Sequence, residues 1–180
     1  MTRGIFEYAA HADPLTAASN KIALVLLGNT PFYPLYLAFC LGRPGWPWLL
    51  FSGVSLPFFA AALPIARRNG FSGRVWLSAV ATLNSTYVTW LLGESSGTAL
   101  FLIPCTALAL MSFRRREWRA MVSLAALPGL LFLSLHNHFP APPAIYSASA
   151  YHALQHLNEF SVISISVVLA YVFGKTRLAA

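Results

Sequence analysis

Four histidines in the last third of the sequence are the clearest candidates for chemistry. His136 and His138 flank one asparagine, and His152 and His156 are four residues apart. Residues with this second spacing share one face of a helix, so the pair can chelate a metal ion, with His136 or His138 as a third ligand. Only Glu159 is near enough in sequence to complete such a site. The alternative, that all four are ordinary polar residues of a loop, stays open.

The cofactor expectation follows from the same residues. A haem held by two histidines needs its axial ligands on two facing helices, and no histidine lies deep within an apolar run. Cys40 and Cys105 have no metal-site or thiol-motif spacing and are predicted to be buried, inert thiols. We therefore expect no cofactor, with a metal ion as the first alternative and haem behind it.

A second set of candidate residues lies inside apolar runs. Asn29 and Asn84 are each near the middle of such a run, at similar depth. Hydroxyl residues near Asn84 form one stripe on a helix, because they are spaced four, three and four apart: Ser78, Thr82, Ser85 and Thr89. Two interpretations are open. The polar residues let helices pack closely, or they form a pocket that binds a small molecule.

Sequence motifs for catalysis are missing from the chain. It has no Gly-rich phosphate loop, no Gly-x-Ser-x-Gly turn and no His-Glu-x-x-His pair. None of its five acidic residues falls in the middle of an apolar run, where a coupled pump needs a carboxylate. The sequence therefore assigns no enzymatic activity and argues against an ion-coupled transporter.

The composition predicts a membrane around most of this chain. Of its 180 residues, 57% are hydrophobic and 9% are charged, whereas soluble domains carry about 25% charged residues. The formal charge of +7 does not indicate a nucleic-acid partner, because the basic residues form short clusters between apolar runs and not one continuous face. We expect the lipid bilayer as a partner, and no nucleic acid.

Six apolar runs are long enough to cross a bilayer, which takes about 20 helical residues. They are Ile22–Leu41, Pro47–Ala66, Val75–Leu92, Glu94–Phe113, Trp118–Leu135 and Leu157–Phe173. We therefore predict an all-α fold, an integral membrane bundle of six transmembrane helices over residues 22–174. Residues 1–21 are predicted to be a cytoplasmic N-terminal segment, and residues 175–180 the start of a cytoplasmic linker. The one long connection is predicted over residues 136–156.

The positive charges set the predicted orientation. With the N-terminus in the cytoplasm, Arg43 is the one outer residue among the 12 lysines and arginines. All the others then lie on the inner side, as the positive-inside rule expects. We predict a multi-pass membrane protein with both termini cytoplasmic.

The outer end then gathers the four histidines together with Trp90, Glu94 and Tyr151. Aromatic walls with a few polar groups are typical of a small-molecule pocket. The alternative is that the aromatic residues form the interfacial belt of a membrane protein. The residues predicted to bind a small hydrophobic ligand are Asn29, Asn84, Thr89, Trp90, Glu94 and Tyr151.

Several short motifs carry a resemblance to a known class of membrane domain. They are Asn84-Ser-Thr, Trp90-Leu-Leu-Gly-Glu-Ser-Ser-Gly97, Phe101, Pro104, Phe113-Arg-Arg-Arg-Glu117-Trp-Arg119 and Asn158. Over roughly residues 22–174 the chain resembles the six-span N-terminal input domains of bacterial signalling proteins. Those domains precede class III adenylate cyclases, sensor histidine kinases or diguanylate cyclases.

The resemblance implies a membrane anchor and receptor for small hydrophobic or interfacial signals. It implies a homodimer whose sixth helix leads into a cytoplasmic output domain, which is not part of this sequence. It assigns no binding residues. Two alternatives stay open: a metal- or haem-binding membrane protein that uses the outer histidines, and a small transporter subunit.

Overall fold

The computed structural model describes residues 2–41 and 46–178, and these residues form α-helices and 3-10 helices with no β-strand. The predicted all-α class is therefore confirmed. The α-helices are α1 (Thr2–Ala9), α2 (Pro14–Asn29), α3 (Tyr33–Leu41), α4 (Trp46–Phe51), α5 (Leu56–Arg68), α6 (Gly70–Leu92), α7 (Leu102–Ser112), α8 (Trp118–Leu135) and α9 (Ala148–Leu178). The 3-10 helices are η1 (Thr30–Phe32), η3 (Glu94–Ser96), η4 (Thr98–Phe101) and η5 (Arg115–Glu117).

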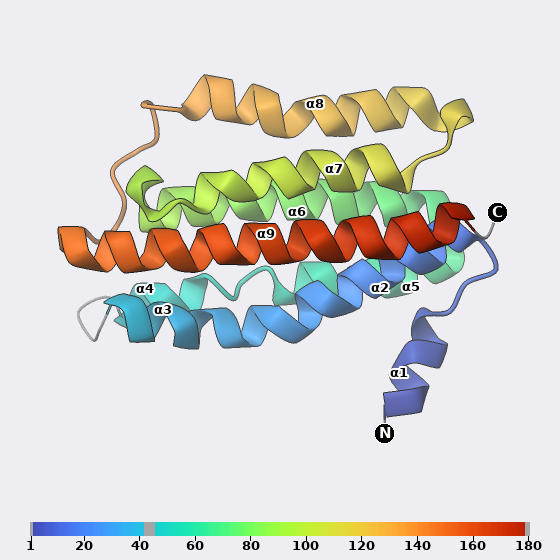
Figure 1. The fold of residues 1–180 in the computed structure, drawn as a ribbon, viewed down its shortest axis with the longest axis horizontal. Coiled ribbons are helices and arrows are strands. Elements are labelled where there is room, and N and C mark those ends of the chain that lie inside the picture. Colours follow the sequence, from blue (N-terminus) through green and yellow to red (C-terminus); the bar gives the residue numbers. More distant parts are fainter. Residues whose placement is uncertain (1, 42–45, 179–180) are drawn as a thin grey trace.

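The long helices lie side by side along one axis of the bundle (Figure 1). Helix α9 packs against α2, α3 and α7, while α6 packs against α5, α7 and α2. Helix α8 lies at the edge, against α7 and α6, and Pro128 is its one buried residue. Helix α1 and the end of α9 lie at the same end of the bundle (Figure 1).

Four helical segments are long and apolar enough to cross a membrane: Pro14–Leu41, Trp48–Arg68, Arg115–Leu135 and Ala148–Thr176. The segment Thr98–Ser112 is also apolar but shorter. Length and composition thus support four of the six predicted runs. Helix α6 carries Arg74 and the stripe of hydroxyl residues on its buried side, so its neighbours and not lipid surround its polar groups.

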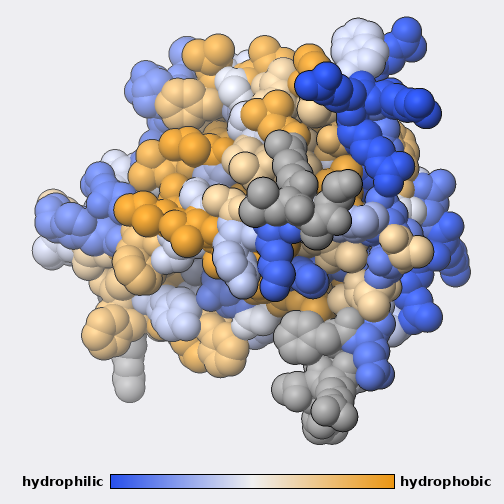
Figure 2. All heavy atoms as spheres, turned by 45° about the vertical axis from the view of Figure 1, so that its right-hand side comes forward, coloured by the Kyte–Doolittle hydropathy of each residue, from blue (hydrophilic) through white to orange (hydrophobic). Residues whose placement is uncertain are grey.

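The outer surface of the bundle is apolar along its flank. Large hydrophobic side chains are exposed there, among them Phe39, Leu133 and Phe160. Figure 2 shows hydrophobic side chains over the flank and hydrophilic side chains toward the ends. A flank covered by large exposed apolar side chains is compatible with a surface that contacts lipid.

Several helix boundaries differ from the sequence prediction. Helix α2 begins at Pro14, because the side chain of Asp13 accepts a hydrogen bond from the backbone N–H of Thr16 and caps the helix. The predicted boundary at residues 21 and 22 therefore falls inside a helix. The predicted run Pro47–Ala66 is interrupted between α4 and α5, and α9 begins at Ala148, within the segment predicted as a loop.

A buried arginine joins separate parts of the chain at one end of the bundle. Arg74 of α6 is only 4% exposed, and its Nη1 and Nη2 donate to the two carboxylate oxygens of Glu117, both at 2.8 Å. Nη1 also donates to the carbonyl of Ser112 at 2.7 Å. Asp13 lies 3.9 Å from Arg74 and 2.6 Å from Arg114. These contacts tie the start of α2, helix α6 and the turn between α7 and α8 together.

The same contacts keep the carboxyl groups of Asp13 and Glu117 ionised. The hydrogen bonds from Arg74 hold the pKa of Glu117 below its ordinary value. Burial raises the pKa of Asp13, but the hydrogen bond from Thr16 and the charges of Arg114 and Arg74 outweigh it, so the pKa is lowered overall. The cluster therefore holds two positive and two negative charges at neutral pH.

Replacing Arg74 by leucine is expected to lower the free energy of unfolding by about 3 kcal/mol. The estimate is the low end of the range for a buried ion pair that loses one partner, because Glu117 is 21% exposed and keeps some contact with water. Unfolding in mixed detergent micelles measures the change. Arg115→Leu is the matched control, since Arg115 is exposed at the same end, and its expected change is within about 0.5 kcal/mol. Equal losses for the two variants would contradict this account of the cluster.

Candidate functional site

A cavity of about 440 Å³ lies within the bundle. It is bounded by α2, η1 and α3 on one side, α6, η4 and α7 on another, and α9, with the turn between α4 and α5 contributing two serines. Cavities of this size fit small-molecule ligands. Helix α9 contributes the most wall residues: Leu157, Phe160, Ser161, Ser164, Ile165, Val168 and Leu169.

The wall is apolar with scattered neutral polar groups, and none of the residues that line it is charged. Phe59, Leu108 and Val88 are among its apolar residues. Asn29 and Asn84, singled out from the sequence, both belong to the wall. The structure therefore brings these two asparagines to one cavity from α2 and α6.

Several hydroxyl groups of the wall are already bonded to backbone carbonyls of their own segments. The Oγ atoms of Ser85 and Ser161 donate to the carbonyls four residues back, at 2.9 and 2.8 Å. Ser52 Oγ donates to the Leu49 carbonyl at 2.6 Å. A small polar side chain that bonds its own backbone is compatible with close helix packing. These hydroxyls therefore need no ligand.

Two buried polar atoms of the wall have no hydrogen-bond partner. Ser55 is 5% exposed, and its Oγ makes no hydrogen bond. Asn84 Oδ1 is also buried without a hydrogen-bond partner. Buried polar atoms are nearly always paired, so each exception requires a reason. A ligand that completes these hydrogen bonds is such a reason.

A satisfied polar network lies next to the cavity. Tyr33 lines the cavity, and its hydroxyl donates to Asn158 Oδ1 at 3.0 Å. Asn158 is fully buried on α9, and its Nδ2 donates to the Ser96 carbonyl at 2.8 Å. The network connects α3, α9 and η3. One wall residue is thus hydrogen-bonded directly to the last helix.

The turn that presents Ser96 depends on glycine. Gly93 and Gly97 have φ angles of 84° and 76°, which side chains other than glycine rarely adopt. A Cβ atom on Gly97 would also lie 3.4 Å from the backbone of Gln155. Ser96 Oγ donates to the Gly93 carbonyl at 2.6 Å and closes the turn. The Gly-x-x-Ser-Gly motif therefore places the Ser96 carbonyl against α9.

The other predicted ligand residues do not line this cavity. Thr89 is buried, and its hydroxyl donates to the Ser85 carbonyl at 2.8 Å. The Trp90 ring packs against Tyr87, with centroids 5.8 Å apart, and the Tyr151 ring packs edge-on against Tyr146. The structure therefore separates Asn29 and Asn84 from Thr89, Trp90, Glu94 and Tyr151. The six residues do not form one site.

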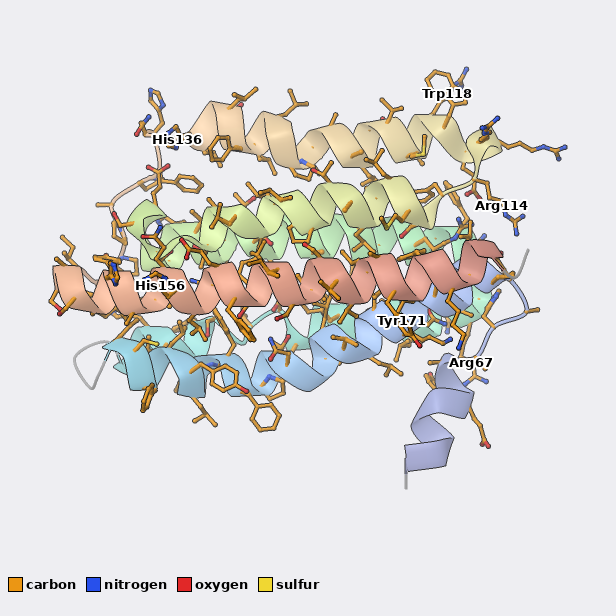
Figure 3. The ribbon with its side chains drawn as sticks, in the orientation of Figure 1. Arg67, Arg114, Trp118, His136, His156 and Tyr171 are labelled. Atoms are coloured by element: carbon orange, nitrogen blue, oxygen red, sulfur yellow. The ribbon has the colours of Figure 1, made fainter. Side chains whose placement is uncertain are left out.

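Glu94 takes part in a contact at the opposite end from the arginines. His136 Nδ1 lies 3.0 Å from Glu94 Oε1, a hydrogen bond in which the carboxylate accepts. The backbone N–H of Asn137 donates to both oxygens of Glu94 at 3.1 Å. Figure 3 shows His136 and His156 at one end of the bundle and Arg67 and Arg114 at the other. Glu94 thus holds the chain where it leaves α8.

The four histidines are divided between two places. His136 and His138 lie after α8, where His138 Nδ1 is 2.9 Å from the His136 carbonyl. His152 and His156 share one face of α9, with ring centroids 4.4 Å apart, and His156 is paired with Glu159 at 3.2 Å. Within residues 2–41 and 46–178, no three His, Cys, Asp or Glu side chains converge as a metal site would require. The histidines offer a metal two ligands at most from one place.

Sequence reasoning did not identify Ser55 and Tyr33 as wall residues. Ser55 lies in Ser-Gly-Val-Ser-Leu-Pro, residues 52–57, where glycine and proline in an apolar run indicate a break in a helix. That signal was available in the sequence. Tyr33 offers no local signal, because its partner Asn158 is 125 residues away.

Comparisons with protein-family models and with curated proteins find no match to this chain.

Two asparagine-to-leucine substitutions are expected to have different effects on stability. Asn158→Leu leaves the Tyr33 hydroxyl and the Ser96 carbonyl without partners, which costs about 1–3 kcal/mol for each group left unpaired in the interior. Asn84→Leu removes an oxygen that has no partner, so no loss is expected. Unfolding in mixed detergent micelles compares the two, with the same change of side-chain volume in each. A larger loss for Asn84→Leu would show that Asn84 bonds within the protein.

Proposed function

We propose that this chain is a sensory domain that crosses the inner membrane of a bacterium six times. It binds a small lipophilic molecule in the cavity and passes its occupancy through α9 to a cytoplasmic output domain. The observation that carries the proposal is the uncharged cavity, which holds unpaired polar atoms and has α9 as its main wall. A plain membrane anchor has no need of such a cavity.

The position of α9 supports its role in transmission. Seven of its residues line the cavity, and Asn158 bonds it to Tyr33 and Ser96. A ligand that shifts Tyr33 therefore also acts on α9. Helix α9 is 31 residues long and finishes at the end of the bundle where Arg67 and Arg114 lie (Figure 3). A rigid helix between cavity and cytoplasm is a direct mechanical connection.

The arrangement of the chain supports six crossings with both ends in the cytoplasm. Helix α1 and the end of α9 lie at the same end of the bundle (Figure 1). Arg67 and Arg114 lie at that end too (Figure 3), as the positive-inside rule expects of a cytoplasmic side. Arg43, the one predicted outer arginine, lies outside the described residues. Helix α6 and the shorter η4–α7 segment complete the six, and each also exposes large apolar side chains, Leu83 on α6 and Ile103 and Leu110 on α7.

The signalling role and the homodimer rest on the resemblance to six-span input domains. The turn from Gly93 to Gly97 and the cluster around Glu117, two of the motifs that carry the resemblance, both have structural roles here. The metal-binding alternative has less support, because the histidines lie at two separate places, each paired with a glutamate. No feature of the described residues favours a transporter.

Reporter fusions are expected to confirm the orientation. A reporter active only in the periplasm, fused after Ala180, should be silent, while the same reporter inserted at Pro142 should be active. Replacing Arg114, Arg115 and Arg116 by alanine should weaken this bias, since each basic residue contributes to it. Periplasmic activity at the C-terminal fusion would overturn the orientation.

Filling the cavity is expected to change the output of a chimera in which the full chain is joined to an adenylate cyclase domain. Ser164→Trp places a large ring in the cavity, whereas Val167→Trp places it on an exposed part of α9. We expect cyclase activity to change about fivefold or more with Ser164→Trp, the size of a modest coupling free energy, and little with Val167→Trp. Equal activity for both variants and the wild-type chimera would leave no role for the cavity in signalling.

A further inference from the structure

We infer that the ligand of the cavity is an uncharged, lipid-soluble alcohol that enters from the hydrocarbon region of the bilayer and bonds to Ser55 and Asn84. The inference rests on the proposed function in one respect, the use of the same cavity. It adds the chemical class of the ligand and the route by which it arrives.

The wall excludes a charged ligand. None of the residues that line the cavity is an aspartate, glutamate, lysine, arginine or histidine. An ion buried without a partner of opposite charge is strongly disfavoured. A fatty acid anion or an amine therefore has nothing to pair with, and the occupant is neutral.

The two unpaired atoms specify the polar group of the ligand. The Ser55 hydroxyl can donate and accept, and the unpaired atom of Asn84 is its carbonyl oxygen. Both oxygens are buried, so a ligand reaches them when the side chains rotate. The terminal torsion of an asparagine is broad, so a rotation of the carboxamide brings its oxygen or its amino group to the cavity. A ligand hydroxyl is both donor and acceptor, so it can bond to the Ser55 hydroxyl and to either group of the Asn84 carboxamide. A pure hydrocarbon leaves both unpaired.

The rest of the wall suits an aliphatic or aromatic body. Ile22, Phe59, Leu108 and Leu169 are buried apolar residues of the wall. The volume of about 440 Å³ admits a medium-sized chain or ring system. Apolar contact supplies most of the binding free energy in such sites, and the polar group sets the orientation.

The opening of the cavity faces the flank of the bundle. Three wall residues are also exposed on the outside: Val25 at 42% and Tyr36 at 45% on α2 and α3, and Phe160 at 71% on α9. All three residues lie within the apolar segments Pro14–Leu41 and Ala148–Thr176. In a bilayer this opening faces the hydrocarbon region, so the ligand enters the cavity from the membrane interior and not from water.

Competition for photolabelling tests the inference. The full chain in phosphatidylcholine nanodiscs is labelled with a long-chain alcohol that carries a diazirine, and labelled peptides are located by mass spectrometry. Dodecanol, dodecane and dodecanoate compete at equal mole fraction in the membrane. We expect dodecanol to reduce labelling of the α9 and α6 wall peptides at about tenfold lower mole fraction than dodecane, since one well-made hydrogen bond to an unpaired group is of that size.

Three variants give the controls. Ser55→Ala and Asn84→Leu should each abolish the preference for dodecanol over dodecane. Ser78→Ala should keep it, because Ser78 on α6 is also a buried serine with an unpaired hydroxyl but does not line the cavity. If Asn84→Leu does not fold, Ser55→Ala decides the matter, since it removes one oxygen atom.

The outcomes separate the two proposals. Equal competition by dodecane, as a lipid acyl chain in the cavity would give, overturns the alcohol while keeping a ligand site. Stronger competition by dodecanoate overturns the neutral ligand, and loss of preference in Ser78→Ala overturns the assignment to Ser55 and Asn84. Absence of label from all cavity peptides, with label elsewhere on the chain, contradicts both the ligand class and the proposed sensory site.

Discussion

The structure depends on the burial of one guanidinium group, that of Arg74. A chain with few charges has few ways to hold the ends of its helices together, and in a membrane lipid supplies no hydrogen bonds. Arg74 solves this at one end by bonding Glu117 and the Ser112 carbonyl while lying near Asp13. Because Asp13 caps α2 and Glu117 ends the 3-10 turn directly before α8, the register of several helices follows from this contact.

The lack of hydrogen-bond partners in lipid also explains the contrast between two asparagines in the interior. Asn158 uses its carboxamide as donor and acceptor between Ser96 and Tyr33, so it stabilises the fold. Asn84 has an unpaired oxygen in the wall of a cavity, which serves no purpose for stability. Buried polar groups without a hydrogen-bond partner are typical of functional positions, where some local stability is lost in favour of binding. Tyr33 lines the cavity and bonds to Asn158, so the wall of the cavity and α9 are physically connected.

Some elements were predictable because their signals are local. The run Trp118–Leu135 has the same bounds in the sequence and in the structure, since charged residues precede it and a polar segment follows it. The start of α9 was missed by nine residues, Ala148 against Leu157, because its first turns carry His152 and His156 on an exposed face. Hydropathy alone does not detect an amphipathic start of this kind. The break between α4 and α5 does have a local signal, the stretch Ser-Gly-Val-Ser-Leu-Pro over residues 52–57, but hydropathy does not detect it because the surrounding run is apolar.

The sequence by itself determined the all-α class, the apolar runs and the separation of arginines from histidines, because hydropathy and charge are properties of single residues and short windows. It also brought Asn29 and Asn84 to attention as polar residues at similar depth. Only the tertiary structure decided that these two share a cavity with Ser55, that Thr89, Trp90, Glu94 and Tyr151 do not, and that the histidines form separate pairs. It also decided which asparagine is satisfied. The partners of Asn158 are 62 and 125 residues away along the chain, and hydrogen bonds over such separations depend on how the helices pack.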